Sequence, residues 1–77
     1  MRTYRDGEVE VGERVTVLDL TTSAAHDYRL VETEGGRNDL SINAPLGSAL
    51  LGRRVGDVVS VEDEGQVIRL EVVEIDG

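Results

Sequence analysis

A single run, from Leu40 to Asp57, places the tightest limits on how this 77-residue chain can fold. It contains the chain's only proline, Pro45, at the point where a strand pattern gives way to a helical one. Residues before a proline are driven away from helical backbone angles, so Ser41–Asn43 is predicted to be extended. Proline suits the first position of a helix, because its missing N–H would have had no partner there. A helix is therefore predicted to begin at Pro45.

The predicted helix is short and has one apolar face. Leu46, Ala49 and Leu50 recur at the spacing that places side chains on one side of a helix. Gly52 is typical of the residue that follows a helix end. The arginines at 53 and 54 are then placed to interact with the negative end of the helix.

Alternating apolar residues predict strands on both sides of this run. The predicted strands cover residues 14–20, 27–33, 58–62 and 66–75. Small polar residues predict loops at 21–26 and 34–39, and Asp63–Gly65 is predicted to be a turn. The first two strands form an antiparallel hairpin in the simplest arrangement. In the last strand the apolar phase changes after Val72, which predicts either a bulge there or a strand that is buried on both faces near its end.

These elements predict one small α+β domain, in which an antiparallel sheet of about four or five strands curls around one short helix. Residues 1–13 are polar and broken by glycines, and Val9 and Val11 alternate with glutamates. This pattern predicts an extended arm or an edge strand, not a helix. The chain is too short for a second domain.

The composition excludes several functional classes. Sixteen acidic residues against eight basic ones give a net charge of −8, which disfavours direct nucleic-acid binding and favours a basic or mixed protein partner. There is no cysteine, so disulfide and thiolate chemistry are absent. No apolar run approaches the roughly 20 residues of a membrane span. We therefore expect a cytoplasmic monomer that makes no membrane contact.

No residue pattern predicts catalysis, a cofactor or a metal. His26 is the only histidine, so a structural zinc site is disfavoured and a loop position is expected. The acidic run Glu62–Glu64 lacks the spacing of a calcium loop and is predicted to be a solvated turn.

The run from Ser41 to Val59 resembles part of the C-terminal domain of bacterial Gre factors (GreA and GreB), which stimulate transcript cleavage. With this run included, matching pieces occur in the family's order over about residues 11–76. They are residues 11–12, 15–17, 28–31, 41–46, 49–52, 55–59 and 72–75. The resemblance implies an FKBP-like fold. Two positions depart from the family pattern: Ala44 stands where a serine is usual, and Glu32 where a glycine is usual.

The resemblance also implies a function, which is docking at the rim of the RNA polymerase secondary channel to regulate elongation. The implied contact residues are Asn43, Ala44, Pro45 and Leu46. Helix N–H groups, a rigid proline and an amide side chain suit such a contact. In the alternative interpretation, Pro45 only starts the helix and Asn43 only satisfies the turn. The usual serine would cap the helix, so with Ala44 this cap is absent unless Asn43 replaces it.

Gre factors also carry an N-terminal coiled coil whose acidic tip helps to hold a catalytic Mg²⁺. A hairpin that reaches tens of ångströms needs on the order of 20–30 residues in each arm. Thirteen residues precede the first predicted strand, so we expect no coiled coil in this chain and no cleavage stimulation. There are two alternatives to this function. The domain could block the channel mouth without entering it, or it could be an FKBP-like interaction domain with another partner. Peptidyl-prolyl isomerase activity is disfavoured, because Tyr4 and Tyr28 are the only aromatic residues that could line its pocket.

Overall fold

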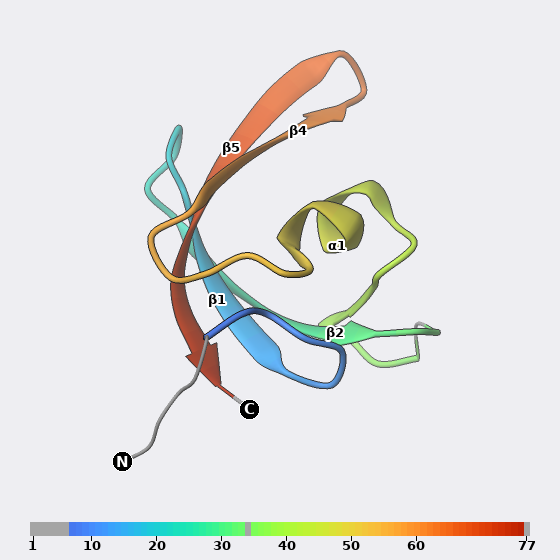
Figure 1. The fold of residues 1–77 in the computed structure, drawn as a ribbon. Coiled ribbons are helices and arrows are strands. Elements are labelled where there is room, and N and C mark those ends of the chain that lie inside the picture. Colours follow the sequence, from blue (N-terminus) through green and yellow to red (C-terminus); the bar gives the residue numbers. More distant parts are fainter. Residues whose placement is uncertain (1–6, 34, 77) are drawn as a thin grey trace.

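The computed structural model describes residues 7–33 and 35–76 (Figure 1). Their secondary structure runs in the order β1 (Arg14–Asp19), β2 (Ala25–Val31), β3 (Asp39–Ser41), α1 (Pro45–Leu50), β4 (Val58–Asp63) and β5 (Gln66–Asp76). The strands form one sheet in the order β3-β2-β1-β5-β4, which curls around α1 (Figure 1). The predicted α+β class, the strand count and the single short helix are confirmed.

One sheet edge differs from the simplest expectation. Strand β3 pairs with β2 in parallel, whereas the other neighbouring strands are antiparallel. The loop after β2 returns the chain to Arg29, so that β3 runs beside the last three residues of β2, and the Arg29 N–H donates to the Asn38 carbonyl at 2.9 Å. The Ile42 N–H then donates to the Val31 carbonyl at 2.9 Å. The sheet is therefore mixed and not wholly antiparallel.

The connection between β1 and β2 is shorter than predicted. Asp19 organises it, because its Oδ1 accepts hydrogen bonds from the backbone N–H groups of Thr21 and Thr22 at 2.8 and 3.1 Å. Since the turn is this compact, β2 already begins at Ala25, and His26 pairs with Val17 of β1. The prediction of His26 as a loop residue is therefore wrong. At its other end β2 stops at Val31, two residues earlier than predicted.

Of the two alternatives for the last strand, the bulge is the one that the structure shows. Thr16 of β1 pairs with Glu74, but the next residue, Val17, pairs with Val72. Val73 is therefore the extra residue, and its side chain is 40% exposed whereas Val72 is fully buried. The bulge changes the phase of β5, so that Ile75 again packs against the core.

The hydrophobic core lies between the concave face of the sheet and α1. Its buried side chains are aliphatic, and no buried polar or charged side chain occurs among the described residues. These core residues are Val9, Val15, Val17, Leu30, Leu50, Val59, Leu70 and Val72. Leu50 is fully buried, and Leu46 and Ala49 pack against the cluster, so the predicted apolar face of the helix is confirmed.

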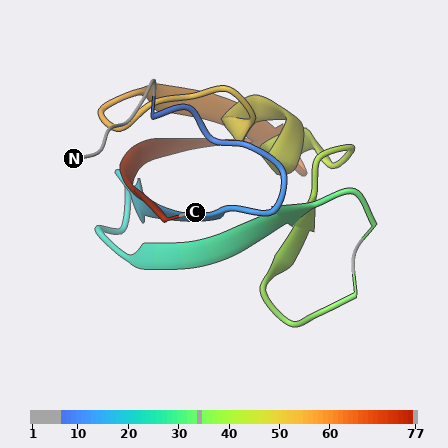
Figure 2. The same ribbon diagram turned by 60° about the horizontal axis from the view of Figure 1, so that its bottom comes forward.

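The N-terminal arm crosses the open side of the curled sheet (Figure 2). Only its residues 7–13 are described, and residues 1–6 of the predicted arm lie outside the described part. Val9 N–H donates to the Arg53 carbonyl, and Gly52 N–H donates to the Val9 carbonyl, each at 2.8 Å. Gly12 N–H donates to the Leu30 carbonyl at 2.7 Å. The arm thus fastens the turn after α1 to β2.

Gly52 follows the end of the helix, as the sequence predicts. Of the two arginines predicted to interact with this end, only Arg53 does so. Gly52 has φ +84°, and the Arg53 N–H donates to the Leu50 carbonyl at 3.0 Å, which closes a turn whose third residue favours glycine. Arg53 Nε donates to the Ala49 carbonyl at 3.1 Å, near the C-terminal end of α1. Arg54 instead lies 3.7 Å from the Glu8 carboxylate.

Gly47 allows α1 to approach the end of β3 very closely. A Cβ atom at this position would lie 2.0 Å from the Ser41 carbonyl oxygen and 2.8 Å from its carbonyl carbon. The obstacle is backbone, which cannot rotate away as a side chain can. The absence of a side chain at Gly47 therefore sets the distance between the helix and the turn that precedes it.

Gly47→Ala is predicted to destabilise the domain. At an ordinary helix position, alanine is better than glycine by about 1 kcal/mol. Here the clash with the Ser41 backbone outweighs that gain, and a net loss of about 1–3 kcal/mol is expected. Urea unfolding followed by circular dichroism measures it, with Ser48→Ala at the adjacent exposed position as the control. A Gly47→Ala domain as stable as the wild type would contradict the close packing.

Val9→Ala and Val11→Ala compare two valines of the same arm. Val9 is 1% exposed, and its truncation is expected to lower the free energy of unfolding by about 2 kcal/mol. Val11 is 43% exposed, so its truncation is expected to change stability by less than about 0.5 kcal/mol. Equal effects in a urea titration would show that the arm does not close the core.

Candidate functional site

Three of the four predicted contact residues line one groove. Ala44, Pro45 and Leu46 form one of its walls, at the beginning of α1. The facing wall comes from the β4–β5 hairpin and consists of Val61, Glu62, Asp63, Ile68 and Leu70. The groove encloses about 190 Å³. The beginning of α1 and the β4–β5 hairpin are separate in the sequence, but they meet in this groove.

The wall at α1 has the geometry of a helix start without a side-chain cap. Ala44 is the N-cap residue, in an extended conformation, and no side chain caps the helix. The Ser48 N–H donates to the Ala44 carbonyl at 2.8 Å, and the Ala44 N–H donates to the Ser41 carbonyl at 3.0 Å. Pro45 occupies the first helical position, as predicted. The backbone, with Pro45, therefore holds this wall in place.

Asn43 lies outside the groove. Its side chain is exposed, and its backbone N–H donates to the Ser41 Oγ at 3.0 Å within the turn before α1. Asn43 does not replace the missing cap of the helix. Of the predicted contact residues, it is therefore the one that the structure separates from the groove.

The facing wall was not predicted as part of the site. Val61 pairs with Ile68, and Val59 with Leu70, in the antiparallel β4–β5 ladder. Val61, Ile68 and Leu70 all present their side chains on the sheet face that carries α1. Their alternation is visible in the sequence, but it predicts only a core face. The face of the β4–β5 hairpin that carries these residues extends beyond the core and lies opposite α1, because the sheet curls (Figure 1).

The chemistry of the groove suits an apolar side chain of another protein. Its lining is mostly aliphatic and contains no aromatic residue among those described. Small-molecule sites usually enclose about 300–1,000 Å³, and this groove is smaller. The volume and the aliphatic lining therefore favour insertion of one or two partner side chains.

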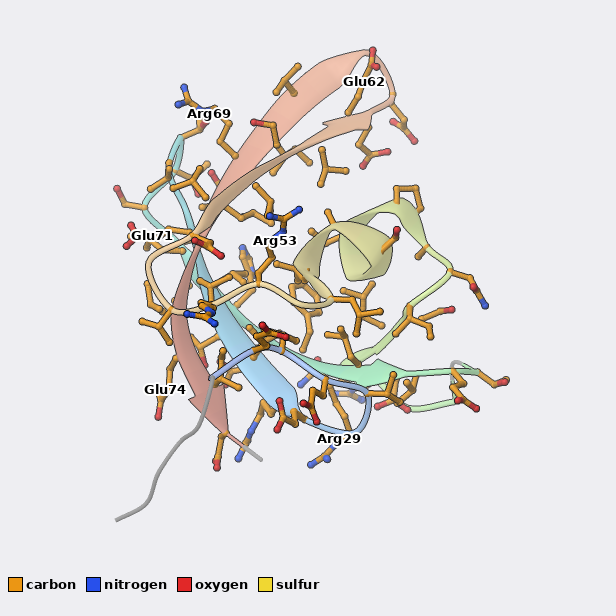
Figure 3. All side chains as sticks on the ribbon, in the orientation of Figure 1. Arg29, Arg53, Glu62, Arg69, Glu71 and Glu74 are labelled. Carbon is orange, nitrogen blue, oxygen red and sulfur yellow. The ribbon has the colours of Figure 1, made fainter. Side chains whose placement is uncertain are left out.

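A second hollow, of about 220 Å³, lies on the outer face of the sheet and is polar. Thr16 Oγ1 donates to Asp27 Oδ1 at 2.7 Å there, and Arg14 lies 3.4 Å from the Asp76 carboxylate. Glu74 completes its lining and is labelled at the outer side of β5 in Figure 3. Within residues 7–33 and 35–76, no group of three or more acidic, histidine or cysteine side chains is arranged to hold a metal ion. In the same residues, no helix is long and apolar enough to cross a bilayer.

Comparison with known proteins identifies the family. The family described as "Transcription elongation factor, GreA/GreB, C-term" matches residues 4–77. The transcription elongation factor GreA of Thermotoga neapolitana is 44% identical over 71 residues, which are 88% of this chain and 46% of that protein. GreA of Yersinia pestis is 32% identical over 74 residues, which are 92% of this chain and 47% of that protein. The chain thus spans about half the length of these relatives.

Solved structures share the fold. Gfh1 of Thermus aquaticus superposes with a TM-score of 0.80 at 33% identity, covering 94% of this chain and 50% of that one. A GreA/GreB elongation factor from Nitrosomonas europaea gives a TM-score of 0.78 at 27% identity, covering 96% of this chain and 64% of that one. The resemblance inferred from the strand-to-helix run is confirmed. The chain belongs to the family of GreA/GreB transcription elongation factor C-terminal domains.

Proposed function

We propose that this domain binds bacterial RNA polymerase at the rim of the secondary channel and thereby regulates transcription elongation. The observation that carries the proposal is the apolar groove between α1 and the β4–β5 hairpin. It gathers Ala44, Pro45 and Leu46, the positions at which the family resemblance implies the contact. Membership of the GreA/GreB family supports the choice of partner.

On this proposal the domain is a docking module and not an enzyme. The groove has an aliphatic lining and two carboxylates, without a histidine or a hydroxyl nucleophile among its lining residues. Stimulation of RNA cleavage belongs, by the family resemblance, to a coiled coil. The helix of the described part spans only six residues. The domain alone is therefore proposed to occupy the docking position without stimulating cleavage.

Binding to core RNA polymerase tests the proposal, measured by fluorescence anisotropy of the labelled chain and by competition with a full-length GreA. Leu46→Ala is expected to weaken binding by about tenfold or more, because an apolar contact in the groove is lost. Leu51→Ala is the matched control, since Leu51 is 40% exposed, lies at the other end of α1 and is not part of the groove lining. Its effect is expected to be less than about twofold.

The outcomes separate the interpretations. Saturable binding that GreA competes away, with Leu46→Ala weak and Leu51→Ala normal, supports docking through the groove. If Leu46→Ala and Leu51→Ala both bind polymerase with the affinity of the wild-type chain, the groove is excluded as the contact. Absence of binding by the wild-type chain at low salt would overturn the choice of partner. Urea titrations of both variants show whether a loss of folding contributes.

Ala44→Ser tests whether the turn before α1 contributes to the contact. A serine hydroxyl at this extended N-cap can accept a hydrogen bond from the Leu46 or Gly47 N–H, and about 1 kcal/mol of added stability is expected. Asn43→Ser is the control, because it places the same hydroxyl one residue before the cap. On the proposed function, the better-ordered turn also raises polymerase affinity. Higher stability with unchanged affinity would mean that Ala44 serves only the fold.

A further inference from the structure

The charged residues that line the groove are all acidic. Glu62 and Asp63 lie beside its aliphatic residues, and no arginine lines it. Both are exposed, and among the described residues neither makes an ion pair or a side-chain hydrogen bond. Glu64 follows directly, so three consecutive carboxylates stand at the end of the groove wall. Their charge is therefore not neutralised within the described part of the domain.

The hairpin fixes where these carboxylates stand. Asp63 pairs with Gln66 across a two-residue turn in which Glu64 has φ +52° and Gly65 has φ +82°. Two successive positive φ angles are typical of the tight turn that matches the twist of an antiparallel hairpin. Side chains alternate along a strand, so Asp63 shares the face of Val61, which lines the groove, whereas the Glu62 side chain belongs to the opposite face of β4. Figure 3 shows the adjacent Glu62 at the hairpin end of β4.

We propose that this groove selects a partner segment in which an aliphatic side chain is flanked by lysine or arginine. The aliphatic side chain enters the space between Leu46 and Ile68. A basic residue beside it faces Asp63, and Glu62 adds negative charge from the opposite face at the same end of β4. The inference rests on the proposed function for the identity of the partner, but not for the chemistry of the contact. Apolar burial supplies affinity, whereas the exposed carboxylates set the association rate, the salt dependence and the choice of partner.

The first experiment measures binding to core RNA polymerase. Glu62→Gln with Asp63→Asn removes both charges while nearly preserving side-chain shape. Glu32→Gln with Glu74→Gln is the matched control, because it gives the same net charge at two exposed positions outside the groove. The groove double variant is expected to bind about threefold to tenfold more weakly at low salt, with a shallower salt dependence. The control is expected to differ from wild type by less than about twofold.

The second experiment replaces polymerase with two synthetic helical peptides. One carries a pair of leucines flanked by arginines, and the other has glutamates in place of the arginines. Titrated into the isotopically labelled chain, the arginine peptide is expected to shift the amide signals of Leu46 and Ile68 and to bind more tightly. This preference is expected to disappear in the Glu62→Gln, Asp63→Asn variant and to persist in the control.

Together, the two experiments distinguish a failure of the proposed function from a failure of this inference. A wild-type chain that ignores polymerase but prefers the arginine peptide would overturn the proposed function and support the inference. Polymerase binding that neither the groove double variant nor salt alters would overturn the inference and leave the proposed function standing. Equal binding of both peptides, or no binding of the arginine peptide, would also overturn the inference.

Discussion

The close contact of Gly47 with the Ser41 carbonyl is the constraint on which the site depends. Because no Cβ intervenes, the first turn of α1 lies directly against the end of β3, and Leu50 reaches the core of the curled sheet. The same contact fixes the direction in which Ala44, Pro45 and Leu46 face the β4–β5 hairpin. The N-terminal arm fastens the other end of the helix through Val9. A six-residue helix with little stability of its own is thus held at both ends by tertiary contacts.

Much of this arrangement could be predicted from local patterns. Pro45 and Gly52 limit the helix at its two ends, and the change of phase after Val72 indicates the bulge that the pairing with β1 confirms. These features depend on residues close together in the chain, where backbone chemistry decides the outcome. Ala44, Pro45 and Leu46, which line one wall of the groove, are implied as contact residues by the family resemblance of the strand-to-helix run, and not by local backbone chemistry.

The features that were not predicted depend on contacts between distant segments. Val9 and Val11 look alike in the sequence, but only Val9 reaches the core, because the arm pairs with the turn after α1. His26 lies in a strand because Asp19 shortens the preceding turn. The hairpin wall of the groove needs the curl of the whole sheet, which brings Ile68 opposite Leu46. No local pattern contains that information.

Amide hydrogen exchange of the chain with and without core RNA polymerase tests whether polymerase docks in the groove between α1 and the β4–β5 hairpin. We expect polymerase to slow exchange in two separate segments, residues 44–48 at the beginning of α1 and residues 61–70 of the β4–β5 hairpin. Little change is expected along the outer face, where Thr16 and Glu74 line the polar hollow. Protection confined to that outer face, with the groove segments unchanged, would contradict docking through the groove.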